Sequence, residues 1–194
     1  MHIYPLFAYS GYEVIFLSNI FQSRLAGFSS KLTQAPQAAA FIEGSEKYPQ
    51  IIGIVRFHQT KLGVLVSAEI KGLPSSENIC NNPVFGFHLH SGNHCDSETH
   101  EPFSEAAGHY NPDECPHPFH AGDFPPLFGN CGYAFSTFLT NRFSLSEIIG
   151  KALIIHASPD DFTSQPAGNS GERIACGIIA MCNSTCRKSA FNQN

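Results

Sequence analysis

Short apolar runs separated by long irregular loops are the feature that most restricts how this chain can fold. Residues 50–59 (QIIGIVRFHQ) and 61–73 (KLGVLVSAEIKGL) contain many β-branched residues in a roughly alternating pattern, with a short break between them. This pattern indicates a β-hairpin. Helical periodicity is limited to about one turn at residues 144–150 (SLSEIIG), so the sequence predicts an antiparallel sandwich or barrel. Further strands are predicted at residues 83–90, 133–140, 151–158 and 173–181.

Two long segments between these strands have no strand or helix pattern of their own. Residues 91–130 are rich in His, Pro, Gly, Asn and Asp, and residues 157–171 read ASPDDFTSQPAGNSG. Irregular loops of such length are uncommon in compact domains and usually carry the function. We therefore expect the functional residues on these loops and at the strand ends beside them.

The net charge and the amino-terminal segment argue against several functions. The formal net charge of the 194-residue chain is −5, which argues against a nucleic-acid partner because phosphates require a basic surface. The apolar start, residues 1–21, contains no basic residue and is interrupted by Glu13. It therefore predicts neither a secretion signal nor a membrane span. A cytoplasmic location is favoured on this ground, with an extracytoplasmic location as the alternative.

Potential metal ligands gather at the strand ends and on the first long loop. His88 and His90 flank one residue in GFHLHSG (86–92). Alternate residues of a strand point to the same face, so both imidazoles can reach one ion while Leu89 packs into the core. Imidazole suits zinc and copper, and a carboxylate can complete a tetrahedral zinc site. The other potential ligands are His109, His117, His120, Asp123 and, at the end of the apolar run ALIIH, His156.

Each of these residues also has a purely structural explanation. His88 and His90 alone fit a polar patch on a sheet equally well, and a histidine at a strand end, such as His156, is more often a surface residue than a ligand. The complete set, surrounded by glycine and proline, is difficult to explain as a solvated loop. The remaining histidines lack such neighbours: His2 and His58 are predicted on the surface, and His94 and His100 are given no role.

Five separated motifs occur along the chain, namely GFHLH (86–90), AGHYNP (107–112), HAGDFPPLFGN (120–130), IGKALIIHASPDD (149–161) and GNSGERIACGII (168–179). Together they resemble the motifs of the copper/zinc superoxide dismutases. The resemblance implies an eight-stranded Greek-key β-sandwich or flattened barrel over residues 36–181. Residues 1–35 are then an N-terminal extension, expected to be poorly ordered, and residues 182–194 are a C-terminal tail. The implied reaction is disproportionation of superoxide to dioxygen and hydrogen peroxide, with copper and zinc as cofactors.

The resemblance also implies roles for individual residues. His109 bridges the two ions and carries a proton to the peroxide. Arg173 matches the arginine that guides superoxide to the copper, and Asp160 matches the carboxylate that connects a copper ligand to a zinc ligand. Cys95 and Cys176 match the disulfide that holds the long loop against the last strand. The implied copper ligands are His88, His90, His109 and His156, and the implied zinc ligands are His109, His117, His120 and Asp123.

Both long loops are shorter than is common in the family. Only two residues separate His117 from His120, and the proline between them favours a turn that lets both reach one ion. Residues 157–172 contain acidic residues but no lysine. We therefore expect superoxide steering to rest mainly on Arg173 and to be weaker than in the fastest members of the family.

The sequence also allows a second function and several states for the remaining cysteines. A non-catalytic copper- or zinc-binding module of the same fold is the alternative function. A missing copper ligand or a missing arginine would favour it, and the sequence lacks neither. Superoxide is the expected small-molecule partner, no membrane is expected, and a homodimer is the assembly considered. The sequence leaves three states possible for the remaining cysteines: a free thiol, a second disulfide or a further metal ligand. Free thiols are the default in a cytosolic chain. These cysteines are Cys80, Cys115, Cys131, Cys182 and Cys186.

Overall fold

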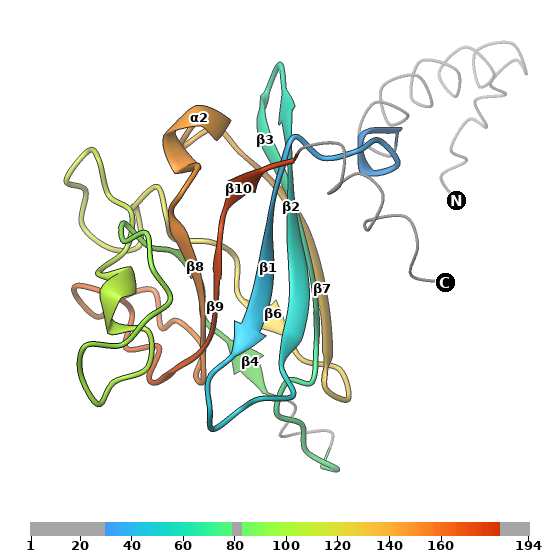
Figure 1. Ribbon diagram of the computed structural model, residues 1–194. Helices are drawn as coiled ribbons and strands as arrows, with labels where there is room; N and C mark the ends of the chain where they lie inside the picture. Colours follow the sequence, from blue (N-terminus) through green and yellow to red (C-terminus); the bar gives the residue numbers. More distant parts are fainter. Residues whose placement is uncertain (1–29, 79–82, 183–194) are drawn as a thin grey trace, which may run out of the picture. The chain divides into compact units, whose positions relative to one another are not determined.

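Residues 30–78 and 83–182 are described by the computed structural model of the chain, which is drawn in Figure 1. The chain divides into two units after Ala35. Residues 30–35 are the described part of the first unit, and residues 30–32 are helical. The expectation of a poorly ordered extension falls mainly on residues 1–29, which lie outside the described residues, as does the tail after Cys182. The second unit begins at Pro36 and contains all the strands.

One antiparallel sheet of eight strands forms most of this domain (Figure 1). Its strands lie in the order β5-β8-β9-β1-β2-β3-β7, β10 pairs with β1, and β4 and β6 form a second small sheet. β9 returns beside β1, next to the consecutive neighbours β1, β2 and β3, which is a Greek-key connectivity. The predicted all-β fold is confirmed. The strands are β1 (Ala38–Gly44), β2 (Ile52–Thr60), β3 (Gly63–Lys71), β4 (Val84–Phe85), β5 (Phe87–Leu89), β6 (Leu127–Phe128), β7 (Tyr133–Thr140), β8 (Ala152–His156), β9 (Arg173–Ile178) and β10 (Ala180–Met181).

The strands predicted from β-branched runs are present, and one of them is interrupted for a reason that matters to the site. β2 and β3 form the predicted hairpin, and β7 has the predicted bounds. The run at residues 83–90 is divided into β4 and β5 at Gly86, whose N–H donates to Ser158 O at 2.8 Å. A Cβ on Gly86 would lie 2.9 Å from the side chain of Ser170. The second long loop therefore packs directly against this backbone.

Two strands and the single helical turn show what the sequence pattern detects and what it misses. β1 begins with three alanines and was not predicted, because alanine has low strand propensity. This end of β1 lies between β2 and β10, and the three alanines are buried completely or nearly so. β6 has only two residues and follows two prolines, so it carries no readable alternation. The predicted helical turn is α2 (Leu145–Ile148), and Ser144 N–H donates to Glu147 at 2.6 Å at its start.

The prediction that His58 lies on the surface is wrong. His58 is 1% exposed, although it alternates with the core residue Phe57 and points to the other face of the sheet. Its partner across the β2–β3 pair, Leu65, is 4% exposed. This part of the second face is thus shielded from solvent, which an alternating pattern cannot reveal. His2, the other histidine predicted on the surface, lies outside the described residues.

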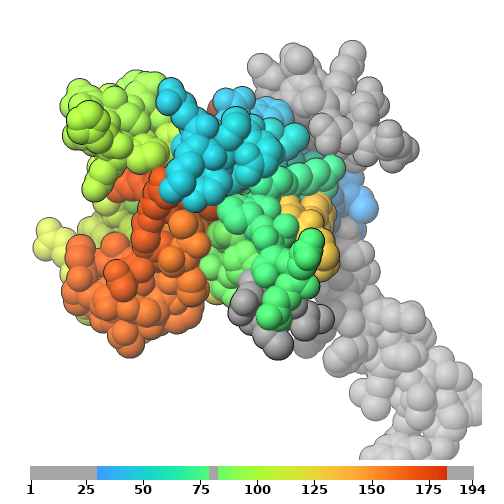
Figure 2. All heavy atoms as spheres, turned by 90° about the horizontal axis from the view of Figure 1, so that it is seen from below, coloured from blue at the N-terminus to red at the C-terminus, as the bar shows by residue number. Residues whose placement is uncertain are grey.

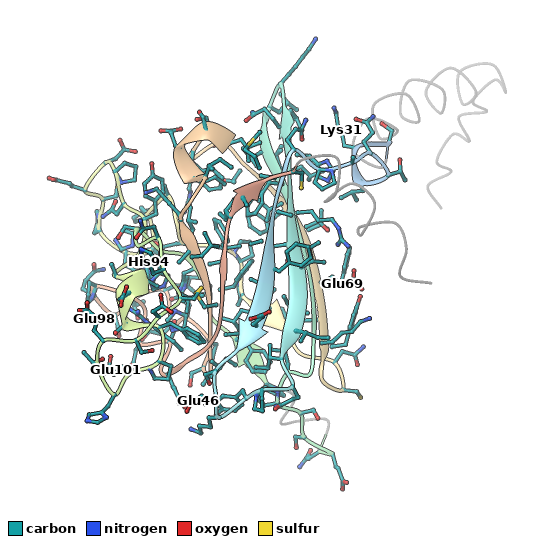
Figure 3. All side chains as sticks on the ribbon, viewed as in Figure 1. Lys31, Glu46, Glu69, His94, Glu98 and Glu101 are labelled. Atoms are coloured by element: carbon teal, nitrogen blue, oxygen red, sulfur yellow. A yellow bond between two sulfur atoms is a disulfide. The ribbon has the colours of Figure 1, made fainter. Side chains whose placement is uncertain are left out.

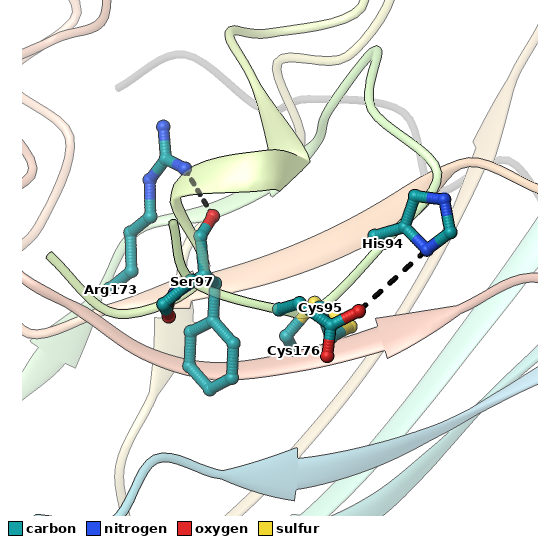
Figure 4. The surroundings of a disulfide bond; sticks show 7 residues. His94, Cys95, Ser97, Arg173 and Cys176 are labelled. Atoms are coloured by element: carbon teal, nitrogen blue, oxygen red, sulfur yellow. Dashed lines mark hydrogen bonds and ion pairs between the residues drawn. A yellow bond between two sulfur atoms is a disulfide. The ribbon is translucent and has the colours of Figure 1, made fainter. Parts of the chain in front are cut away.

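The two long loops lie on the same side of the domain, yellow-green and orange in Figure 2. A disulfide between Cys95 and Cys176, the pair that the resemblance implied, ties the first loop to β9 across 81 residues of sequence (Figure 4). Cys115 and Cys131 are free thiols. Cys80 and Cys186 lie outside the described residues. Within residues 30–78 and 83–182, no helix has both the length and the apolar character needed to cross a bilayer.

Candidate metal centre

Two neighbouring strands carry three of the predicted ligands. His88 is the middle residue of β5, His90 follows the strand, and His156 is the last residue of β8, which pairs with β5. Leu89 is 0% exposed and lies in the core. The alternation of a strand therefore sends the imidazoles of His88 and His90 away from the core and toward the same side.

The first long loop is joined to β5 by backbone hydrogen bonds. The N–H of Leu89 donates to Gly122 O at 2.9 Å, and its carbonyl accepts the N–H of Tyr110 at 2.8 Å. Residues of the loop thereby become bridge partners of the strand end: Asp123 lies opposite His88, and His109 lies opposite His90. Backbone pairing, rather than the sequence spacing, places these loop residues beside the strand.

Four imidazoles converge at this place, and we call them the four-histidine cluster: His88, His90, His109 and His156. Their candidate ligand atoms lie within 4.8 Å of one another, and Nε2 of His90 is 3.4 Å from Nε2 of His156. Nδ1 of His88 and Nε2 of His109 are buried without a hydrogen-bond partner. Buried polar atoms are normally paired, so these two nitrogens fit a bound cation.

The second ring nitrogen of each histidine has a hydrogen-bond acceptor beside it. An acceptor requires the proton on that nitrogen, which leaves the lone pair of the other nitrogen directed into the cluster. This arrangement of partners suits a metal ion with imidazole ligands. The pairs are His88 Nε2 with Asp160 Oδ2 at 2.9 Å, His90 Nδ1 with Ala107 O at 2.8 Å, His109 Nδ1 with Asp123 Oδ1 at 2.7 Å, and His156 Nδ1 with Gly171 O at 3.2 Å.

A second group, the three-histidine–aspartate cluster, shares His109 with the first and consists of His109, His117, His120 and Asp123. Nδ1 of His120 is 3.3 Å from Asp123 Oδ1. Nδ1 of His117 lies 3.1 Å from Asp123 Oδ2. The two atoms form no hydrogen bond, and this buried nitrogen has no other hydrogen-bond partner. Three imidazole nitrogens and one carboxylate are a donor set that fits tetrahedral zinc.

Asp160 connects the two clusters by hydrogen bonds to one histidine of each. Its two carboxylate oxygens accept hydrogen bonds from Nε2 of His88 and Nε2 of His117, each at 2.9 Å. Gly168 makes this contact possible, since a Cβ there would clash with the Asp160 carboxylate and lie 2.7 Å from His117 Nε2. The sequence analysis gave Gly168 no role. The only signal was its place between Ala and Asn in a turn-forming stretch.

Burial favours the neutral form of three histidines of the first cluster. Burial lowers the pKa of His156 to about 3 and holds the pKa of His90 well below its usual range, and it also lowers the pKa of His88. Burial alone would raise the pKa of Asp160, but hydrogen bonds from His88, the Phe162 N–H and His117 outweigh it and lower the pKa to about 2. Neutral imidazoles beside an ionised carboxylate are the protonation states that bind metal ions.

Arg173 lies at the start of β9, half-buried beside the four-histidine cluster. Its Nη1 donates to Phe103 O, a bond drawn as a dashed line in Figure 4, and its Nη2 donates to Ala107 O; both distances are 2.6 Å. The Ala107 carbonyl also accepts from His90. One carbonyl thus fixes the arginine relative to a ring of the cluster. Burial lowers the pKa of Arg173 and Glu101 partly opposes the shift, and the guanidinium remains charged.

The histidines that were given no role lie away from both clusters. His94 is exposed on the first long loop, with Nδ1 3.8 Å from the Asp96 carboxylate (Figure 3). His100 is exposed on the same loop. Two residues that the sequence analysis missed contact the three-histidine–aspartate cluster through its backbone, namely Gln165 and Arg142.

Comparison with known proteins agrees with this geometry. The family model for copper/zinc superoxide dismutase matches residues 51–179. Superoxide dismutase [Cu-Zn] 2 of Aquifex aeolicus (strain VF5) is 35% identical over 178 residues, which cover 84% of this chain and 98% of the relative. Superoxide dismutase [Cu-Zn] of Escherichia coli (strain K12) is 36% identical over 149 residues, covering 70% of this chain and 82% of the relative.

A solved structure gives the same result at the level of the fold. The Cu/Zn superoxide dismutase from Brucella abortus aligns with a TM-score of 0.61 and 25% sequence identity, covering 73% of this chain and 98% of that protein. The matched region includes both histidine clusters and Arg173. The chain is therefore a member of the copper/zinc superoxide dismutase family.

Proposed function

We propose that this chain disproportionates superoxide, converting two superoxide ions and two protons to dioxygen and hydrogen peroxide. The observation that carries the proposal is the convergence of four imidazoles beside a fixed arginine. The relatives that match are named superoxide dismutases. The domain responsible is proposed to comprise residues 36–181.

The four-histidine cluster is proposed to hold copper, through Nδ1 of His88 and Nε2 of His90, His109 and His156. Copper, when bound, supplies one-electron chemistry between Cu(II) and Cu(I), which lets one superoxide be oxidised and the next be reduced. The hydrogen bonds to the opposite ring nitrogens hold the imidazoles in one orientation, so little reorganisation is needed between the two states.

The three-histidine–aspartate cluster is proposed to hold zinc, which has no redox chemistry and serves to order the loop. Its ligands would be Nδ1 of His109, His117 and His120 and the carboxylate of Asp123. Zinc binding would release the proton that Nδ1 of His109 directs at Asp123 in the metal-free chain. Asp160 supports both sites at once by holding His88 and His117 in place.

His109 is proposed to hold one of the two protons that the reaction consumes, at Nε2 when this nitrogen is not bound to a metal ion. Its Nδ1 is 2.7 Å from Asp123, and its Nε2 faces the four-histidine cluster without a partner. A proton taken up at Nε2 therefore points to the place where the second superoxide is reduced, and it can be donated to the forming peroxide.

The direct test is to load the purified full chain with copper and zinc and to measure both metal content and superoxide removal. We expect one copper and one zinc per chain together with rapid removal of superoxide. The alternative, a non-catalytic metal-binding module, predicts the same metal content without superoxide removal. Failure to bind one copper per chain would refute the proposed copper site.

Replacing Arg173 by alanine should slow superoxide removal by about 10-fold, because the variant loses the fixed cation that attracts and holds the anion. The metal content should not change, since Arg173 contacts backbone carbonyls and none of the ligand side chains. Arg173→Lys keeps the charge but loses the two parallel N–H donors of the guanidinium. Its rate of superoxide removal should lie between those of the wild type and Arg173→Ala. Equal rates in the wild type and Arg173→Ala would contradict the role.

The salt dependence of the rate should be shallow. The loop before Arg173 has no lysine, and the first long loop carries the exposed acidic residues Glu98 and Glu101 (Figure 3). Long-range attraction of an anion is then weak, and screening by salt has little to remove. The measurement is the rate of superoxide removal between low and physiological ionic strength. A steep fall with salt would show that steering is strong after all.

A homodimer is part of the proposal and rests on exposed apolar side chains. Phe128 is 71% exposed, Phe119 63% and Phe135 59%. Contiguous exposed apolar patches are typical of surfaces that bind another protein chain, whereas single exposed aromatic residues are common on any protein surface. Light scattering on the full chain across a range of concentrations is the check, and a monomer at every concentration would contradict the dimer.

A further inference from the structure

The short segment that carries His117, His120 and Asp123 is held in place by two side chains from elsewhere in the sequence. Only two residues separate His117 from His120, and His120 is linked to Asp123 by a hydrogen bond from its N–H to the carboxylate at 2.9 Å. The Asp123 N–H also donates to His120 O at 3.2 Å, and the Phe119 N–H donates to Pro116 O at 2.9 Å. None of these bonds involves the backbone of His117. Gln165 and Arg142 bond to the backbone of the segment from two different loops.

Gln165 binds both backbone groups of His117. Its Oε1 accepts the His117 N–H at 3.0 Å, and its Nε2 donates to the His117 carbonyl at 2.7 Å. The side-chain amide therefore imitates one rung of an antiparallel strand pair across 48 residues of sequence. The ring of the same histidine is bonded at Nε2 to Asp160, on the same loop as Gln165. With backbone and ring both fixed, Nδ1 of His117 can point only into its cluster.

Arg142 binds the other half of the segment. It lies just after β7, and its Nη1 donates to His120 O at 3.0 Å, with Pro118 O and Asp123 O each at 3.5 Å. One guanidinium nitrogen thus lies within hydrogen-bond distance of carbonyls from three positions along the turn. Gln165 and Arg142 are both exposed residues, so neither side chain is needed to fill the core.

We propose that Gln165 and Arg142 are positioning residues for zinc, because they fix the backbone from which His117 and His120 project. This inference rests on the proposed zinc site. Groups that orient metal ligands are worth roughly 10- to 100-fold in metal affinity when removed. The two residues act on different ligands through separate bonds, so their effects should add.

The experiment measures zinc affinity in the full chain by competition with a chromophoric zinc chelator. Gln165→Met and Arg142→Met should each weaken zinc binding by about 10-fold, and the double variant by about 100-fold. Gln165→Glu keeps an acceptor for the His117 N–H but loses the donor, and should lie between wild type and Gln165→Met. Gln50→Met is the matched control, since it removes an exposed glutamine side chain outside both loops, and should bind zinc as the wild type does.

A second readout separates positioning from a general loss of stability. Cobalt(II) bound in place of zinc reports its ligand geometry through visible absorption, and we expect the bands to change in both Met variants. Unchanged zinc affinity and unchanged cobalt bands, with only a lower melting temperature, would overturn the inference while leaving the proposed function intact. A wild-type chain that binds no zinc would instead refute the zinc site itself, and the inference with it.

Discussion

Replacing His88 by alanine is expected to lower superoxide removal by more than about 100-fold and to prevent stable copper binding. The reason is geometric: Nδ1 of His88 is one of four nitrogens of the cluster and is buried without another partner. The substitution also deprives Asp160 of one of the two imidazoles that it connects. Loss of an outer partner alone costs up to about 100-fold, so loss of the ligand itself should cost more. Copper content and superoxide removal are the measurements.

A control is needed because His88 is fully buried and its truncation leaves a cavity. His58→Ala provides it, since His58 is a comparably buried strand histidine outside both clusters. His58→Ala should lower thermal stability but retain one copper per chain and its activity once folded. His88→Gln fills most of the volume without an imidazole and should remain inactive. Full activity in either His88 variant would mean that the cluster is not the site of the reaction.

The half of the site that lies on strands could be predicted from the sequence. His88 and His90 share a face because strand residues alternate, and the buried Leu89 between them follows from the same rule. The strands themselves were readable because residues 50–59 and 61–73 are β-branched and bounded by turns. Local patterns of this kind depend only on neighbours in the sequence.

The half that lies on the loops depends on contacts between distant residues, and these leave no local pattern. Spacing alone allowed His117 and His120 to reach one ion, but their orientation comes from Asp160, Gln165 and Arg142. The resemblance to a family supplied Asp160 and could not supply the other two. The prediction that His58 lies on the surface is wrong for the same reason. Its burial depends on what covers the second face of the sheet rather than on its own strand.

Removing the disulfide with the double change Cys95→Ala and Cys176→Ala should reduce the free energy of unfolding by about 4.5 kcal/mol. The bond closes a loop of 81 residues, and restricting so long a loop in the unfolded chain accounts for a value of this size. Denaturant unfolding of the metal-loaded and metal-free chains is the measurement. Cys115→Ala is the matched control, because it removes a free thiol, and should leave the free energy of unfolding nearly unchanged. A loss below about 1 kcal/mol would mean that the reduced chain keeps the loop closed by other contacts.

The disulfide should also affect the reaction through Arg173. Both carbonyls that hold the guanidinium, Phe103 O and Ala107 O, lie on the loop that the disulfide ties to β9. A small apolar cluster that includes Ala106 packs around the disulfide and anchors this stretch. Without the covalent bond the stretch can move, and Arg173 loses its fixed place. His90 also loses a fixed acceptor at Ala107 O, whereas β5 and β8 still hold the backbones of His88 and His156. The double variant should therefore still bind copper but remove superoxide more slowly, as Arg173→Ala does. Adding Arg173→Ala to the double variant should slow the rate little further, because both changes act on the same group.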